Sequence, residues 1–276
     1  MKAPLKLTLA LFALAVLAFG ADAKIKIGVV PGVFGDSIAI AAKEAKAHGI
    51  DAQLVEFTDW TTINIATDRG DLDLNYYQHQ AFLNNAIAKN GYKLASIGYG
   101  VLPNIGLYSL KHKSFKEIPN GGVAAIANDP INQGRGLQLL ERAGLIKLKS
   151  GVGDKGTLSD IIDNPKKLRF VEVEGPQLAR AAQDVDLAQG YPHFIVASKA
   201  FDASSGLIYS GIEGEEYAVR FVVPEAKKND PILRKFVEIY QNSAAVKAAI
   251  HKGYAYDNRL YSLAWLNEPS ASGDCH

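Results

Sequence analysis

Cysteine is nearly absent from this sequence: the only one among 276 residues is Cys275, next to the C-terminal end. A single cysteine excludes an intramolecular disulfide. Lipid attachment at an export signal requires a cysteine directly after the cleavage point, and Lys24 follows the best candidate, Ala23. We therefore expect that the protein is not lipid-anchored, and that Cys275 lies in a flexible tail without function, residues 266–276.

Neither sign of charge is in excess. The chain has 30 lysines and arginines against 29 aspartates and glutamates, a formal net charge of +1. A basic patch for nucleic acid or an anionic membrane surface needs a clear excess of positive charge. We therefore expect neither partner.

Long hydrophobic runs are missing as well. The one candidate, from Leu7 to Phe19, is shorter than the roughly 20 apolar residues that span a bilayer. It follows the cations Lys2 and Lys6 and precedes the small-residue pattern that ends at Ala23, which is typical of a signal peptide. We expect residues 1–23 to be removed and the protein to work in the periplasm. An uncleaved anchor or a buried helix is the alternative.

Catalytic motifs are also lacking. The sequence has no G-x-S-x-G elbow, no phosphate-binding P-loop and no C-x-x-C pair. Residues 151–156 match G-x-G-x-x-G, but the lysine-rich stretch 145–150 before them cannot be a central parallel strand. The six histidines show no metal-ligand spacing. We expect no enzyme activity, cofactor or metal.

Strand and helix patterns alternate along the chain, which predicts an α/β fold with helices on both faces of its sheets. The polar stretch 111–117 separates two such series, and the chain returns to the first near residue 217. We predict lobe one from residues 24–110 and 217–265, and lobe two from 111–216. The ligand should lie between them, at the carboxyl ends of the strands. The double crossing predicts a monomer that closes about a hinge.

The stretch Asn128–Gly136 leaves a predicted strand and opens a predicted helix. Backbone N–H groups at a helix start attract anions, and Asn132 lies among them. Arg135, expected in the first turn, could add a planar grip on a carboxylate. The alternative is an exposed arginine paired with Asp129.

Aromatic and polar side chains gather near a third predicted strand. Tyr77 and His79 lie at its end, and Trp60 lies in the preceding loop. Aromatic rings at a cleft give a ligand a large apolar contact at low entropic cost. From position alone, a role of His79 as a helix cap or core residue explains it as well as a ligand contact does, and Phe82 is better explained as core.

Several long strings carry a family resemblance: Gly70–His79, Ala127–Arg135, Gly144–Gly153, and the shorter 164–168 and 175–180. Over residues 24–254 the sequence resembles the NlpA family, methionine-binding lipoproteins of ABC importers. The resemblance implies a type II periplasmic-binding fold, an amino acid or short peptide as ligand, and the importer's membrane subunits as partners. It also implies that Arg135 holds the ligand carboxylate, with Trp60, Tyr77 and His79 as pocket wall.

The sequence departs from that family at Tyr191. The family has an asparagine there that helps to hold the ligand amine, and a phenol offers no amide carbonyl to an ammonium group. We therefore expect Tyr191 to line the pocket and to change the class of ligand. An enzyme or a ligand-free interaction protein on the same scaffold is the alternative function.

Overall fold

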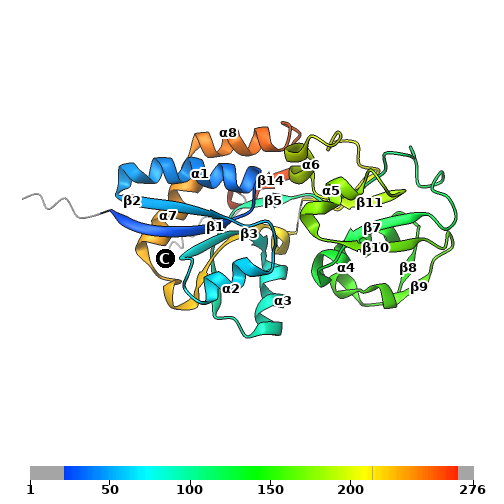
Figure 1. The fold of residues 1–276 in the computed structure, drawn as a ribbon, viewed down its shortest axis with the longest axis horizontal. Coiled ribbons are helices and arrows are strands. Elements are labelled where there is room, and N and C mark those ends of the chain that lie inside the picture. Colours follow the sequence, from blue (N-terminus) through cyan, green and yellow to red (C-terminus); the bar gives the residue numbers. More distant parts are fainter. Residues whose placement is uncertain (1–21, 213, 267–276) are drawn as a thin grey trace, which may run out of the picture.

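The computed structural model describes residues 22–212 and 214–266. Most of the predicted signal peptide and the predicted tail with Cys275 lie outside these residues. Two five-stranded sheets, each with its own helices, form two lobes side by side along the long axis (Figure 1). No helix within the described ranges has the length and apolar character that a membrane crossing requires.

The first sheet lies in the half that holds the described N-terminal strand. Its strands, in the order in which they pair, are β2 (Ile50–Glu56), β1 (Ala23–Val29), β3 (Leu74–His79), β13 (Val219–Pro224) and β4 (Leu94–Tyr99). β1 runs parallel to β2 and β3, whereas β13 runs antiparallel to β3 and β4. β3 is buried along its whole length, because helices cover both faces of the sheet.

The helices of this lobe are α1 (Val33–Ala45), α2 (Thr62–Asp68), α3 (Gln80–Asn90), α7 (Pro231–Asn242) and α8 (Ala244–Gly253). In Figure 1, α1 and α8 lie on one side of the sheet, and α2 and α3 lie on the other. Gly91 ends α3 in the left-handed region, with φ of 72°. A side chain at this backbone position would be strained.

The second sheet is built in the same way. Its strands, in pairing order, are β10 (Arg169–Val173), β7 (Val123–Ala127), β11 (Leu187–Gly190), β6 (Gly106–Tyr108) and β12 (Ile208–Tyr209). The first three run parallel, and β6 pairs antiparallel with β11 and β12. Its helices are α4 (Pro130–Arg142), α5 (Leu178–Ala181) and α6 (Pro192–Ser198).

The chain crosses between the sheets earlier than predicted. The polar stretch 111–117 was expected to be the crossing, yet β6 already pairs within the second sheet. The crossing follows β5 (Val101–Pro103), which pairs with β14 (Tyr261–Leu263) beside the first sheet. A further small pair, β8 (Lys147–Leu148) and β9 (Ile161–Asp163), extends the second lobe. The lobe boundaries themselves stay a prediction.

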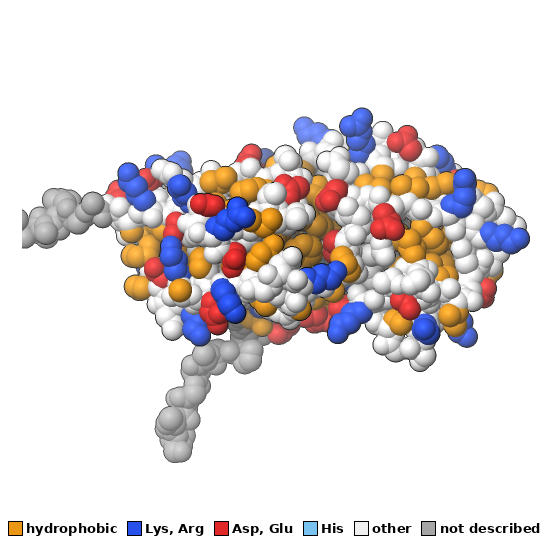
Figure 2. All heavy atoms as spheres, turned by 60° about the horizontal axis from the view of Figure 1, so that its bottom comes forward, with side chains coloured by type: hydrophobic (Ala, Val, Ile, Leu, Met, Phe, Trp, Pro, Cys, Tyr) orange, Lys and Arg blue, Asp and Glu red, His pale blue; other side chains and the backbone are white. Residues whose placement is uncertain are grey.

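The charged side chains follow no single-sign pattern on the face shown in Figure 2. Lysines and arginines are interspersed with aspartates and glutamates over both lobes. This face therefore has no extended field of one sign that would attract a polyanion.

Candidate functional site

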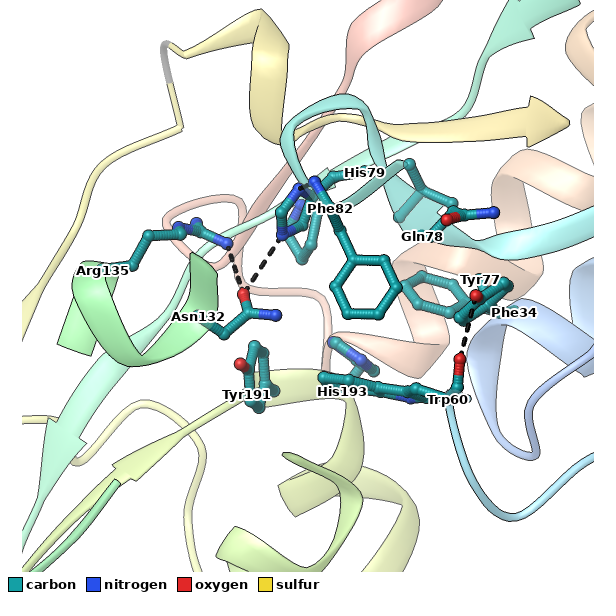
Figure 3. A pocket seen from close by; sticks show the side chains of 12 residues that line it. Phe34, Trp60, Tyr77, Gln78, His79, Phe82, Asn132, Arg135, Tyr191 and His193 are labelled. Atoms are coloured by element: carbon teal, nitrogen blue, oxygen red, sulfur yellow. Dashed lines mark hydrogen bonds between the residues drawn. The ribbon is translucent and has the colours of Figure 1, made fainter. Parts of the chain in front are cut away.

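A cavity between the lobes gathers side chains from both of them (Figure 3). It lies where β1, β2, β3 and β7 end, the edge at which parallel sheets bind ligands. Its lining consists of Phe34, Trp60, Tyr77, Gln78, His79, Phe82, Pro103, Asn132, Arg135, Tyr191, His193 and Val219. The structure thus brings every predicted ligand-binding residue to one cavity: Trp60, Tyr77, His79, Asn132, Arg135 and Tyr191.

Arg135 lies in the second turn of α4, not in the first turn as predicted. The helix begins at Pro130 and is capped by the Asp129 side chain, which accepts a hydrogen bond from the Asn132 backbone N–H. Proline is well suited to this position because its missing N–H would have no partner there. In the second turn the helix macrodipole has little effect on the Arg135 charge, since the dipole acts mainly on the first turn.

The Arg135 side chain is buried, with only 4% of its surface exposed. Its guanidinium donates to Asn132 Oδ1 at 3.3 Å and lies over the Tyr217 ring, 4.0 Å from the ring centre. Among the described residues, no carboxylate lies within 4.0 Å of it. An exposed ion pair with Asp129 is therefore not what this arginine makes.

Burial lowers the pKa of Arg135, but an arginine still stays protonated at any physiological pH. A buried charge is costly unless an opposite charge or several hydrogen bonds compensate it. The guanidinium has five N–H donors, and one hydrogen bond to a described side chain is seen. An anion in the cavity would provide the missing compensation.

His79 is held in one neutral tautomer. Its Nδ1 accepts a hydrogen bond from the Phe82 backbone N–H at 3.1 Å, so this nitrogen carries no proton. Its Nε2 lies 3.1 Å from Asn132 Oδ1 and therefore donates to it. Burial, reinforced by the charge of Arg135, lowers the pKa of His79 to about 3. His79 is thus both the cap of α3 and part of the cavity wall.

Asn132 connects His79 and Arg135. Its Nδ2 donates to both carboxylate oxygens of Asp129, at 3.1 and 3.0 Å, which turns Oδ1 toward the other two side chains. Behind it, Gln189 donates to the Asn132 backbone carbonyl at 2.9 Å and accepts from the Ala127 N–H at 3.0 Å. Gln189 was not predicted, because the four-residue strand β11 has no clear pattern.

Aromatic side chains form the other end of the cavity. The Trp60 ring makes edge-to-face contacts with Phe82 and Tyr191, at centroid distances of 6.1 and 5.8 Å. Tyr77 fixes the Trp60 loop by donating its hydroxyl to the Trp60 carbonyl at 3.0 Å. A Cβ at Gly175, after β10, would approach the Trp60 ring within 2.2 Å, so only glycine fits there.

Sequence reasoning missed part of this wall. Phe34 follows β1, a strand end at which the ligand was expected, and could have been found by that signal. His193 lies in the first turn of α6, two residues after Tyr191. Phe82 was assigned to the core, and Val219, from the returning strand, carries no sequence signal.

Two polar atoms at the cavity are buried without a hydrogen-bond partner among the described residues: the Trp60 Nε1–H and the Tyr191 hydroxyl. A buried polar group without a partner costs roughly 1–3 kcal/mol. Both atoms belong to side chains that line the cavity, as does the Arg135 guanidinium. The arrangement suits a ligand that carries acceptors at one end and an apolar body.

The cavity lining contains no serine, threonine, cysteine, lysine, aspartate or glutamate, so it offers no activated nucleophile beside a base. Residues 22–212 and 214–266 also contain no group of three metal-binding side chains.

Known proteins with a similar sequence or fold cover most of the chain. The D-methionine-binding lipoprotein MetQ of Escherichia coli K12 is 38% identical over 243 residues, 86% of this chain and 89% of that protein. A nutrient-binding protein from Burkholderia cenocepacia, solved with methionine, has a TM-score of 0.79 at 36% identity, covering 84% of this chain and 97% of that one. A periplasmic substrate-binding protein of an ABC transporter from Coxiella burnetii reaches 0.78 at 33% identity, with coverages of 84% and 97%.

These similarities confirm the predicted α/β fold of periplasmic binding proteins and correct the prediction about anchoring. The expectation that the protein is not lipid-anchored is wrong, because MetQ and the matching family are both named as lipoproteins. Such names indicate a lipid-anchored periplasmic protein.

The family described as NlpA lipoprotein matches residues 25–261, from the first strand of the first sheet to β14. This range includes both sheets and every residue that lines the cavity. The chain belongs to the NlpA lipoprotein family.

Proposed function

We propose that this protein is an extracytoplasmic solute-binding protein that delivers a small carboxylate, such as a methionine-like amino acid, to an ABC importer. The observation that carries the proposal is the buried Arg135 at the inter-lobe cavity, with no carboxylate of the described residues within 4.0 Å of it. Relatives named for methionine binding and for ABC transport support the same role. The proposal includes no catalytic step.

The polarity of the cavity suggests how such a ligand lies. Its carboxylate would face Arg135, which His79 and Asn132 hold in place. Its apolar body would pack against Trp60 and Tyr77, between the two lobes. Tyr191 would close the cavity from the second lobe. These roles follow from the positions of the side chains and from the charge of a carboxylate.

The proposal also includes a rotation of the two lobes and a monomeric state. A cavity lined from two lobes opens and closes as the lobes rotate about the crossing segments. A single chain provides both halves of the cavity, so a monomer is sufficient. Free amino acids fit an enclosed site of this kind better than a peptide with a long chain beyond its carboxylate.

The test is a calorimetric titration of Arg135→Ala and Arg135→Lys with the small molecule that copurifies with the wild-type protein. Truncating one partner of a buried charge pair costs about 2–5 kcal/mol, or roughly 30- to 5,000-fold in affinity. Lysine should recover only part of the loss, because a point charge cannot replace the planar fork of the guanidinium.

The matched control is Arg142→Ala. Arg142 ends the same helix, is exposed and does not line this cavity, so its removal should leave the affinity unchanged. An affinity in Arg135→Ala equal to that of the control would place the carboxylate elsewhere. A large fall in the thermal midpoint of ligand-free Arg135→Ala would instead assign Arg135 a role in folding.

A further inference from the structure

We propose that Gly175 and Trp60 are a matched pair that sets how far the two lobes close: Gly175 leaves free the space that the Trp60 ring occupies when the lobes come together. The inference rests on the proposed function and adds a positioning residue, Gly175, to its binding step. Gly175 is buried and is not part of the cavity lining. It therefore acts on the ligand through Trp60.

The Trp60 ring comes from the first lobe and packs against the second. Trp60 lies in the loop between β2 and α2. Its ring contacts Phe82 of the first lobe at a centroid distance of 6.1 Å. From the second lobe it contacts Tyr191 at 5.8 Å and Phe194 at 6.2 Å, and its six-membered ring lies over Gly175. The ring is thus part of the contact between the lobes.

The loop that carries this ring is fixed to the first lobe. The Asp59 side chain accepts from the backbone N–H groups of Thr61 and Thr62, at 2.8 and 2.9 Å. The Tyr77 hydroxyl donates to the Trp60 carbonyl at 3.0 Å. When the lobes move relative to each other, Trp60 therefore moves with the first lobe and Gly175 with the second.

Space, and not backbone conformation, requires the glycine at position 175. Its φ lies outside the left-handed region in which a side chain is strained, so the backbone itself would accept alanine. A Cβ there would lie 2.2, 2.5 and 2.9 Å from three carbons of the Trp60 ring, whereas carbon atoms in contact lie about 3.5–4.0 Å apart. These three are the nearest atoms, and all belong to the other lobe.

The clash therefore acts on the closed arrangement alone. In the structure the lobes are closed, since His79 of the first lobe donates to Asn132 of the second at 3.1 Å. The Trp60 Nε1–H is then buried without a partner among the described residues, which disfavours closure because water would bind it in the open protein. Ligand contacts must outweigh this cost, and a methyl group at position 175 would add to it.

The experiment is a double-mutant cycle measured by calorimetry on the full-length protein: wild type, Gly175→Ala, Trp60→Phe and the double variant. The probes are D- and L-methionine and the small molecule that copurifies with the wild type. Gly175→Ala should weaken binding about 10- to 100-fold, the usual size of an overpacking penalty. With Trp60→Phe already present, adding Gly175→Ala should change the affinity by about twofold or less, because the shorter ring leaves room.

Gly98→Ala is the matched control. Gly98 lies on β4, also with φ outside the left-handed region, and a Cβ there would lie 2.7 Å from Val237 of the same lobe. This variant should lower the urea midpoint of the ligand-free protein and keep the wild-type affinity. Gly175→Ala should do the reverse, because an open ligand-free protein keeps the Trp60 ring away from position 175.

Fluorescence adds a readout that a purely structural role of Gly175 would not change. The chain has two tryptophans, so Trp265→Phe leaves Trp60 as the only reporter. In this background, a saturating probe should shift the emission to shorter wavelength, because the ring leaves water as the lobes close. The shift should be smaller with Gly175→Ala and complete with Gly98→Ala.

Each result decides the inference. Wild-type affinity in Gly175→Ala, or an equal loss of affinity with and without Trp60→Phe, overturns it and leaves the proposed function standing. A fall in ligand-free stability as large as that of Gly98→Ala also overturns it, because the clash would then exist without ligand. If the wild type binds none of the probes, the proposed function fails and the inference fails with it.

Discussion

His79 and His193 are both buried side chains of the cavity wall. His79 donates from Nε2 to Asn132, whereas the ring of His193 packs against Phe34 at a centroid distance of 4.6 Å and against Phe194 at 4.3 Å. Desolvation is the main reason that both pKa values are lowered from 6.5 to about 3. The folded protein therefore keeps both rings neutral under conditions in which the unfolded chain protonates them.

This difference predicts a pH dependence of stability. Above about pH 6.5 neither state binds these protons, so the contribution of the neutral rings is complete. As the pH falls from 6.5 toward 3, the unfolded chain takes up protons that the folded protein excludes. Each histidine then removes about 1.4 kcal/mol of unfolding free energy per pH unit.

The measurement is urea unfolding of the wild type and of His193→Leu between about pH 6.5 and 5. His193→Leu removes one of the two groups, so its unfolding free energy should fall less steeply with decreasing pH. The exposed His48 provides the control, because His48→Gln should keep the wild-type slope. Parallel curves for His193→Leu and the wild type would show that His193 is not buried as a neutral ring.

At the scale of elements, the start of α4 joins folding to the site. Asp129 caps this helix and also orients Asn132. Asp230 caps α7 in a similar way, by accepting from the Ile232 and Leu233 N–H groups, but it lies outside the cavity. The two caps thus separate the capping effect from the effect on the ligand.

We expect Asp129→Ala and Asp230→Ala to lose about 1 kcal/mol of stability each, the usual contribution of a helix cap. Only Asp129→Ala should also weaken the ligand, by about 10-fold, because Asn132 is then free to turn away from Arg135. Denaturant unfolding and calorimetry on both variants check this. Equal affinities in the two variants would contradict a positioning role for Asp129.

The elements that the sequence predicts well are those with local signals. Gly49 and Gly91 both adopt the left-handed conformation that ends a helix, and glycine is the usual residue there. α4 begins earlier than the prediction for Arg135 implies, because Asp129 is its cap and Pro130 its first residue. β6 was placed in the wrong sheet, because pairing between distant strands leaves no mark in a three-residue segment.

The residues of the candidate site also divide into those with a local sequence signal and those without one. Arg135, His79 and Trp60 could be found because they follow predicted strands and carry unusual chemistry. Gln189 could not be found from the sequence. Its role is to hydrogen-bond to Ala127 and Asn132, which lie more than fifty residues away in the chain. The burial of Arg135 was also beyond the sequence, since it depends on both lobes.

At the scale of the whole molecule, the two lobes are joined where Asn104 lies. Its Nδ2 donates to the Arg259 carbonyl, and its Oδ1 accepts from Ser210 Oγ at 2.8 Å and from the Gly211 N–H at 3.0 Å. Asn104 thereby connects three segments that are distant in sequence: the first crossing, the returning chain and the C-terminal part.

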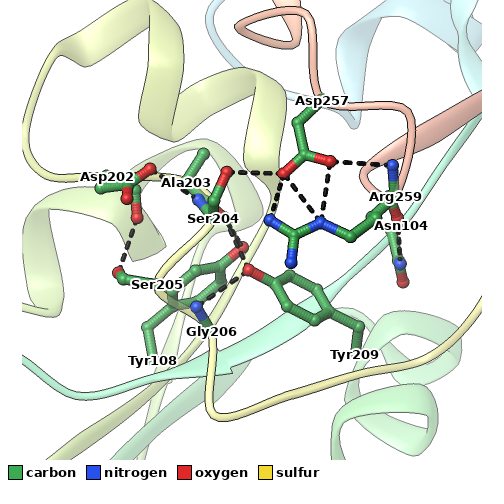
Figure 4. Close-up of polar contacts among 10 residues, drawn as sticks. All are labelled: Asn104, Tyr108, Asp202, Ala203, Ser204, Ser205, Gly206, Tyr209, Asp257 and Arg259. Atoms are coloured by element: carbon green, nitrogen blue, oxygen red, sulfur yellow. Dashed lines mark hydrogen bonds and ion pairs between the residues drawn. The ribbon is translucent and has the colours of Figure 1, made fainter.

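A second set of contacts reinforces this junction (Figure 4). Ser204 of the second lobe donates to the Asp257 carboxylate at 2.7 Å. Arg259 donates to the same carboxylate and lowers the pKa of Asp257. None of these residues lines the cavity. These contacts tie the two lobes at a place away from the cavity, and the hinge of the proposed function would lie there.

Native mass spectrometry of the purified protein tests the central claim most directly. The claim is that one chain holds one small carboxylate between its lobes through Arg135. We predict a one-to-one complex whose small molecule, released on unfolding, carries a carboxylate. It should be present in the wild type and in Arg142→Ala and missing from Arg135→Ala. An equal amount of bound molecule in all three proteins, or a released molecule without an acidic group, would contradict the account.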